Sequence, residues 1–272
     1  MKAQTLQVPG ATLYYETRGS GPVLLLIAGG NGDADFYKGV ADLLASDYTV
    51  VTYDQRGNSR SLLDGPPPAD LHIEVLSSDA QRLLKTVTSG PAYVFGSSSG
   101  AIIGLDLIAR SPRLISRLVA HEPPIVEVLP DVARWRAFFE DVYNTYRRDG
   151  LQAAHMKFAA GVGLHIDEPA LGVEMPPEAV ALAMRAARNV DFFLAHEILP
   201  FTRYVPDLPA LDASRDRIVL AGGQDSRAHL PYRPAAWLAE RFGSRVVDFP
   251  GDHLGYAGQP VAFAAQLREV LG

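Results

Sequence analysis

The stretch Gly96-Ser97-Ser98-Ser99-Gly100 lies between residues 92–95, an apolar run that favours a strand, and residues 101–110, which favour a helix. A strand-to-helix turn as tight as this holds its central residue in a strained backbone conformation. It also leaves no room for side chains two positions away on either side. The two glycines of the stretch meet that requirement. The pattern therefore predicts a nucleophile elbow with Ser98 at its tip.

The rest of the chain surrounds this elbow with a regular alternation of strands and helices. Residues 5–8 and 11–16 alternate in polarity and predict an antiparallel hairpin. Continuous apolar runs, typical of strands buried on both faces, follow at residues 23–27, 48–53, 92–95, 115–120, 217–221 and 245–249. Helical patterns lie between and after them, near residues 37–45, 74–88, 101–110, 231–241 and 261–271. This order predicts an α/β protein with a mostly parallel, eight-stranded sheet and helices on both faces.

The alternation of strands and helices stops between residues 124 and 208. This part of the sequence is helical in pattern, rich in aromatic residues and without a clear strand. We therefore predict a core formed by residues 1–123 and 209–272, with residues 124–208 inserted after the sixth strand as a helical cap.

Composition excludes several classes of function. Of the 272 residues, 47% are hydrophobic and 21% are charged, which is typical of a globular protein. The formal net charge of −6 offers no basic surface for nucleic acid or an anionic membrane. There is no cysteine, so any nucleophile is not sulfur. The apolar runs are too short to span a bilayer and the first residues lack a signal-peptide pattern, so we expect a cytoplasmic protein. A homodimer is left open.

A serine nucleophile needs a histidine to take its proton and a carboxylate to orient that histidine. Of the seven histidines, His253 follows the last predicted core strand and is the candidate base. Asp225 follows the preceding strand and Glu122 follows the sixth, so either could supply the acid. Position favours Asp225, because the chain order Ser98, Asp225, His253 is that of an α/β-hydrolase. Glu122 is the alternative.

With these motifs, nearly the whole chain resembles the α/β-hydrolase superfamily, which implies that fold and a hydrolase. The run Tyr53-Asp54-Gln55-Arg56-Gly57 is also similar to that superfamily's turn after the fourth strand, where its role is structural.

A narrower resemblance is to lactonases that open zearalenone. It is carried by the elbow run, residues 97–101, and by His121-Glu122-Pro123-Pro124. In those enzymes the acid occupies the place matched by Glu122.

An oxyanion needs two backbone donors in place before the reaction. One is expected from Ser99 and the other from the glycine-rich turn at residues 28–33, at Gly30 or alternatively at Asn31. The superfamily usually has His-Gly where this chain has Ala28-Gly29, but a backbone donor does not require that histidine.

No cofactor is expected, because the turn at residues 28–33 lacks the complete phosphate-loop and dinucleotide-loop patterns. The sequence also has no His-Glu-X-X-His or similar ligand cluster, so no metal is expected.

These features predict a serine carboxylic-ester hydrolase, an esterase or lactonase, acting on a small hydrophobic ester or lactone. A serine cannot form the alkyl-ester intermediate of relatives that use an aspartate at the elbow. The cap aromatics favour an uncharged, hydrophobic substrate. Candidate pocket residues are Trp135, Phe139, Tyr143, Phe192 and His196. Two alternatives remain open: a small-molecule receptor whose triad is inactive or slow, and a cofactor-free oxygenase or perhydrolase.

Overall fold

The computed structural model describes residues 1–30, 32–164 and 176–272. Within these residues, nine strands form one sheet in the order β1-β2-β4-β3-β6-β7-β8-β9, with β5 paired to β2. The strands are β1 (Lys2–Val8), β2 (Ala11–Arg18), β3 (Val23–Ile27), β4 (Thr49–Tyr53), β5 (Leu62–Leu63), β6 (Ala92–Ser97), β7 (Ile115–His121), β8 (Ile218–Gly223) and β9 (Val247–Phe249).

The predicted mostly parallel sheet is confirmed. β1 and β2 form the antiparallel hairpin, and β2 pairs antiparallel with β4. From β4 through β3, β6, β7 and β8 to β9, every neighbouring pair is parallel. The two-residue strand β5 was not predicted, because a segment that short carries no periodicity.

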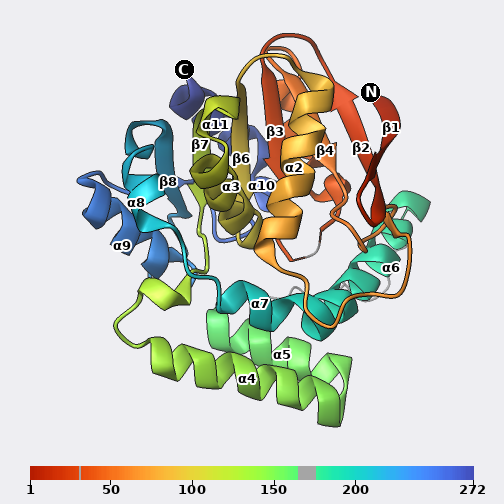
Figure 1. Cartoon of the computed structure of the whole chain (residues 1–272), viewed down its shortest axis with the longest axis vertical. Helices are drawn as coiled ribbons and strands as arrows, with labels where there is room; N and C mark the ends of the chain where they lie inside the picture. Colours follow the sequence, from red (N-terminus) through yellow and green to blue (C-terminus); the bar gives the residue numbers. More distant parts are fainter. Residues whose placement is uncertain (31, 165–175) are drawn as a thin grey trace.

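Helices cover both faces of the sheet, and alternate residues of each central strand enter two different cores (Figure 1). In β3, Leu25 and Ile27 pack with α2 (Ile73–Val87) and α3 (Ser99–Arg110). Leu24 and Leu26 pack on the other face with α1 (Lys38–Leu44) and α11 (Pro260–Leu271). The continuous apolar runs of the sequence arise from this burial on both faces. Also present are η1 (Ala34–Tyr37), η2 (Pro112–Leu114), η5 (Arg215–Arg217), α9 (Tyr232–Phe242) and α10 (Gly255–Gly258).

Between β7 and β8 the described residues form helices and no strands. Besides η5, they are η3 (Val126–Val128), α4 (Val132–Asp149), α5 (Leu151–Val162), α6 (Pro177–Phe192), the π-helical turn η4 (Phe193–Glu197), α7 (Ile198–Thr202) and α8 (Leu208–Asp212). We call residues 124–164 and 176–207 the helical segment. Figure 1 shows α4, α5, α6 and α7 gathered at one end of the sheet. The domain boundaries at 123/124 and 208/209 stay a prediction.

The parallel strands all direct their carboxyl ends toward the helical segment, so the loops that follow β3, β6, β7, β8 and β9 meet there. In open α/β sheets this edge is where ligands bind.

Candidate active site

Ser98 occupies the sharp turn between β6 and α3, as predicted. Its backbone has φ 56° and ψ −128°, a strained conformation for a residue with a side chain. A Cβ atom added to Gly96 would lie 2.3 Å from the carbonyl oxygen of Gly100. One added to Gly100 would lie 2.2 Å from the carbonyl oxygen of Ile27. The flanking glycines are therefore required by close backbone contacts, and the turn presents Ser98 beyond the carboxyl edge of the sheet.

His253 lies in the loop after β9 and is hydrogen-bonded to Glu122. The distance from His253 Nδ1 to Glu122 Oε2 is 2.5 Å, and both side chains are buried. The other carboxylate oxygen of Glu122 accepts a hydrogen bond from the backbone N–H of Gly223 at 2.8 Å. Burial alone would raise the pKa of Glu122, but the hydrogen bond and charge of His253, with the N–H of Gly223, hold it below its usual value. The pair is thus arranged as an ionised carboxylate that orients an imidazole.

The preference for Asp225 as the partner of His253 is corrected by this geometry. Asp225 is exposed, and its backbone N–H donates to the carbonyl of Gly251. Glu122 instead has φ 49°, a left-handed conformation that turns the chain sharply at the end of β7. Its carboxylate thereby reaches past the end of the adjacent strand β8 to His253. Because both candidates follow neighbouring parallel strands, chain order could not separate them.

Two of the predicted oxyanion donors, Ser99 and Gly30, belong to turns that lie beside Ser98. Ser99 is the first residue of α3, so its N–H has no acceptor within the helix. The turn after β3 passes directly against the nucleophile, since a Cβ added to Gly29 would lie 2.9 Å from Ser98 Cβ. Ser99 and Gly30 both line the same cavity as Ser98. The alternative donor, Asn31, lies outside the described residues.

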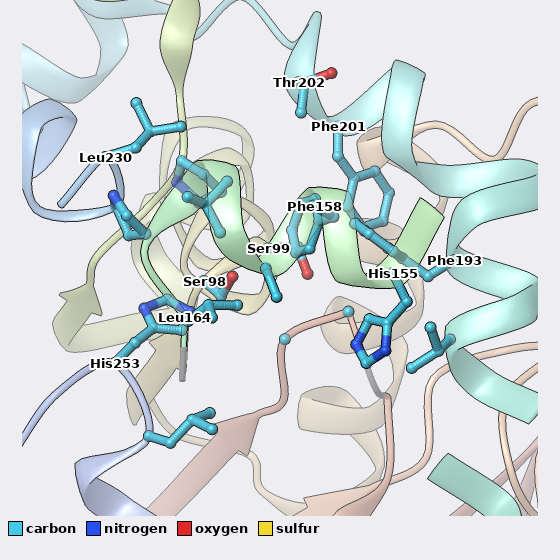
Figure 2. Close-up of a pocket in the computed structure, with 18 of the residues that line it drawn as sticks. Ser98, Ser99, His155, Phe158, Leu164, Phe193, Phe201, Thr202, Leu230 and His253 are labelled. Carbon is cyan, nitrogen blue, oxygen red and sulfur yellow. The ribbon is translucent and has the colours of Figure 1, made fainter. Parts of the chain in front are cut away.

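A cavity of about 390 Å³ joins these groups to the helical segment (Figure 2). Ser98 and His253 contribute to its core side, and Phe139, Phe158, Phe193 and Phe201 to its other side. The remaining lining residues are mostly apolar: Ala28, Gly29, Gly30, Phe36, Ser99, Pro124, His155, Ala159, Val162, Leu164, Val190, Leu194, Thr202, Leu230, Pro231, Leu254 and Tyr256. A largely apolar cavity with few polar groups is typical of a small-molecule site.

Of the five predicted pocket residues, the structure places Phe139 in the lining and the other four elsewhere. Trp135 is buried within the helical segment, where its indole N–H donates to Asp131. Tyr143 also packs on that core, and Phe192 stacks against His196 with 4.8 Å between ring centroids. Aromatic content alone did not identify the inner helix face, because α4 packs behind α5 and much of its apolar surface holds the two helices together.

His155 is a polar lining residue that the sequence interpretation missed. It lies on α5, half-buried, and Figure 2 shows it on the other side of Ser98 and Ser99 from His253. Burial lowers its pKa, which keeps the imidazole neutral near pH 7. The residue lies in a helix with no motif around it. Only its spacing of three residues from Phe158, on the same face of α5, could have indicated its position.

Neither a metal-binding cluster nor a membrane-spanning helix occurs among residues 1–30, 32–164 and 176–272. No group of three or more His, Cys, Asp or Glu side chains is arranged to hold a metal ion there. None of the described helices combines the length and the apolar character needed to cross a bilayer.

Comparison with known proteins agrees with the fold. Residues 22–159 match the family model of the alpha/beta hydrolase fold. The uncharacterized hydrolase YraK of Bacillus subtilis (strain 168) is 40% identical over 273 residues, covering 98% of this chain and 95% of YraK. The chain therefore belongs to the α/β-hydrolase family. It is a hydrolase with that family's mostly parallel sheet.

Solved structures show the same fold over the whole chain. The enol-lactonase from Burkholderia xenovorans LB400 has a TM-score of 0.71 at 20% identity, covering 98% of this chain and 99% of that one. A thermophilic esterase from Thermogutta terrifontis has a TM-score of 0.73 at 18% identity, covering 99% and 98%. At these identities the likeness concerns the fold alone.

Proposed function

We propose that this hydrolase is a serine carboxylic-ester hydrolase that cleaves an ester or lactone of a small hydrophobic molecule without a cofactor. The observation that carries the proposal is the pairing of His253 with Glu122 beside a cavity that Ser98 also lines. A nucleophile on a strained turn, a histidine and a buried carboxylate are the parts that acyl transfer requires.

In the proposed mechanism, Ser98 Oγ attacks the substrate carbonyl carbon while His253 takes the hydroxyl proton. Glu122 keeps the imidazole in the required tautomer and stabilises the imidazolium. The N–H groups of Ser99 and Gly30 donate hydrogen bonds to the oxyanion of the tetrahedral intermediate. His253 then gives its proton to the leaving alkoxide oxygen, and an acyl-enzyme on Ser98 remains.

Water hydrolyses the acyl-enzyme by the same steps in reverse. His253 takes a proton from water, hydroxide attacks the acyl carbon, and the proton returns to Ser98 Oγ as the carboxylic acid leaves. With a lactone, the alcohol released in the first half stays attached to the acyl chain, so the cavity must hold the opened product. The phenylalanine side chains that line it suit an uncharged, apolar substrate.

The test is reaction with a fluorophosphonate probe, followed by intact mass and peptide mapping, beside hydrolysis of short-chain p-nitrophenyl esters and a macrocyclic lactone. We expect one adduct, on Ser98, and turnover of at least one ester or lactone. Ser98→Ala should remove the adduct and lower kcat on the order of 10⁴-fold or more. Wild-type turnover by Ser98→Ala would refute the mechanism. Tight ligand binding with neither adduct nor turnover would favour the receptor alternative.

A further inference from the structure

One face of helix α6 and its π-helical continuation η4 lies against the loops that carry the proposed oxyanion hole. The residues of this face are spaced by four, at Arg185, Asn189, Phe193 and Glu197, so their side chains project on the same side. Each of them contacts either the turn after β3 or the turn after β4. We call these four residues the docking face of α6.

Arg185 binds the turn after β3 through two carboxylates. Its Nε lies 2.7 Å from Asp33 Oδ2 and its Nη2 lies 2.7 Å from Asp35 Oδ2. Asp33 is fully buried, whereas the Arg185 side chain is 16% exposed, so water screens this contact weakly. Burial alone would raise the pKa of Asp33, but hydrogen bonds from Arg185, from Ser59 and from the N–H of Asp35 hold it below its usual value. Asp33 therefore stays charged.

The next two residues of the docking face reach the same loops. Asn189 Oδ1 accepts a hydrogen bond from the N–H of Ser59 at 2.9 Å, and its Nδ2 donates to Ser59 Oγ at 2.7 Å. Ser59 Oγ in turn donates to Asp33 Oδ2 at 2.6 Å. Phe193 covers Gly30 itself, because a Cβ added to Gly30 would lie 2.9 Å from a ring carbon of Phe193. The docking face thus contacts the turn at the proposed oxyanion donor and at its acidic end.

The core holds the same turn at several other points. Arg60 Nη2 lies 3.4 Å from Asp33 Oδ1 and 3.5 Å from Asp35 Oδ1. The backbone N–H of Ala34 donates to Asp54 Oδ1 at 2.8 Å. Gln55 Nε2 donates to the carbonyl of Ala28 at 2.6 Å. The backbone N–H of Gln55 donates to the carbonyl of Gly32 at 2.9 Å. The turn is therefore held from the core at Ala28, Gly32 and Asp33 and from α6 at Gly30 and Asp33. At Asp33 the ion pair with Arg185, at 2.7 Å, is shorter than the one with Arg60, at 3.4 Å. Oxyanion donors accelerate a reaction only if they are already in position when charge develops.

We propose, on the basis of the function given above, that Arg185 is a positioning residue that sets the Gly30 amide through Asp33. The oxyanion hole is then complete only while α6 is docked on the core. Arg185 is not among the residues that line the cavity, so it acts through the turn and not on the substrate. The docking of α6 on the turn after β3 is in this way coupled to the rate of the chemical step.

The test compares Arg185→Gln with a matched control, Arg233→Gln, in the full chain. Arg233 also forms a bidentate ion pair between the core and the helical segment. Its Nη1 lies 3.0 Å from Asp131 Oδ2 and its Nη2 lies 2.8 Å from Asp131 Oδ1, but it contacts neither the turn after β3 nor the turn after β4. Loss of a whole oxyanion donor costs about 10²- to 10³-fold in kcat, so displacing one should cost about 10- to 100-fold. We expect that loss in kcat for Arg185→Gln, with KM changed less than about 3-fold. Arg233→Gln should leave kcat within about 2-fold.

A second readout separates positioning from general loosening of the fold. A boronic acid forms a tetrahedral adduct with a serine nucleophile, whereas the carboxylic acid product does not. For Arg185→Gln, the Kd of a boronic acid inhibitor should rise by about the factor by which kcat/KM falls, and the Kd of the product should not change. Arg185→Lys keeps the charge but cannot bridge both carboxylates as the guanidinium does, so its kcat should lie between wild type and Arg185→Gln.

Equal kcat values for Arg185→Gln and Arg233→Gln would overturn the positioning role, as would a proportionate loss of boronic acid and product affinity. If Arg185→Gln does not fold, Arg185→Lys and Asp35→Asn decide the question by the same two readouts. These results are distinguishable from failure of the proposed function, in which Ser98→Ala keeps its activity and Arg185 then has no oxyanion donor to position.

Discussion

Two buried glutamates differ in charge near pH 7. Glu122, at the end of β7, is ionised, whereas Glu197, in the helical segment, is neutral. Glu122 is fully buried, and its carboxylate has His253 on one oxygen and the N–H of Gly223 on the other. Glu197 is 1% exposed. Its Oε1 accepts a 3.5 Å contact from Asn58 Nδ2, and its Oε2 has no hydrogen-bond partner among the described residues. The two side chains differ in their partners and not in their burial.

The pKa values follow from that difference. Burial in a medium of low polarity disfavours the charged form of any carboxyl. At Glu197 this effect prevails over the weak contact from Asn58 and raises the pKa to about 8. At Glu122 burial acts in the same direction, but His253 and Gly223 reverse it and lower the pKa. The surroundings of Glu122 on the core side of the site therefore stabilise a negative charge, while those of Glu197 in the helical segment keep its carboxyl neutral near pH 7.

The largest expected effect on kcat comes from removing the negative charge of Glu122, on the core side of the site. Glu122→Gln removes the charge that stabilises the imidazolium, and kcat should fall about 10³- to 10⁴-fold. Asp225→Asn is the matched control. Because Asp225 is exposed and His253 is paired with Glu122, kcat of this variant should stay within about 2-fold of wild type. Steady-state kinetics on the best ester decide between them, and a large loss for Asp225→Asn alone would restore the original preference.

The second prediction concerns the stability of the fold as a function of pH. The pKa of Glu197 is raised from 4.5 to about 8 in the folded state. Between these values only the folded protein holds the proton, so raising the pH destabilises it. Relative to Glu197→Gln, wild type should lose up to about 1.4 kcal/mol of unfolding free energy per pH unit in this window. Below pH 4.5 the two proteins should respond to pH alike.

Chemical denaturation at several pH values from 5 to 8.5 measures this difference. Glu140→Gln is the control, since Glu140 is half exposed and pairs with Arg203 on the surface. Glu122 should contribute with the opposite sign, because its lowered pKa stabilises the fold above its usual pKa and that contribution is lost as the pH falls. A flat difference between wild type and Glu197→Gln from pH 5 to 8 would show that Glu197 is ionised or paired.

The smallest expected effect, on kcat/KM, concerns the two histidines that line the cavity, which differ in their hydrogen-bond partners. His253 is paired with Glu122, whereas His155 has no hydrogen-bond partner among the described residues. A neutral imidazole offers one donor and one acceptor to the substrate. We expect His155→Phe to lower kcat/KM about 10-fold for esters with a hydroxyl or carbonyl group at the distal end of the acyl chain. A factor of about 10 corresponds to the free energy of one hydrogen bond. Unsubstituted esters of the same length are the control, and equal losses for both would contradict the assignment.

The sequence predicted the core elements closely, because each depended on local patterns. β3 was predicted at its observed bounds, and the elbow between β6 and α3 was located from two glycines and a change of periodicity. The sequence also indicated Ser98 and His253, which the structure brings to one cavity. It ranked Glu122 second to Asp225 as the partner of His253, and four of its five pocket candidates lie outside the lining, since both depend on which way a side chain points. The resemblance to zearalenone lactonases stays a prediction.

The sequence by itself determined the α/β order of elements and the turn that carries Ser98, because apolar periodicity and the absence of a Cβ act within a few residues. Only the tertiary structure decided that Glu122 pairs with His253, a contact between residues 131 positions apart. It also decided that Arg185 of α6 reaches Asp33. The physical reason is the same in both cases. A carboxylate gains its role from the donors that surround it, and those donors come from segments that only the folded chain brings together.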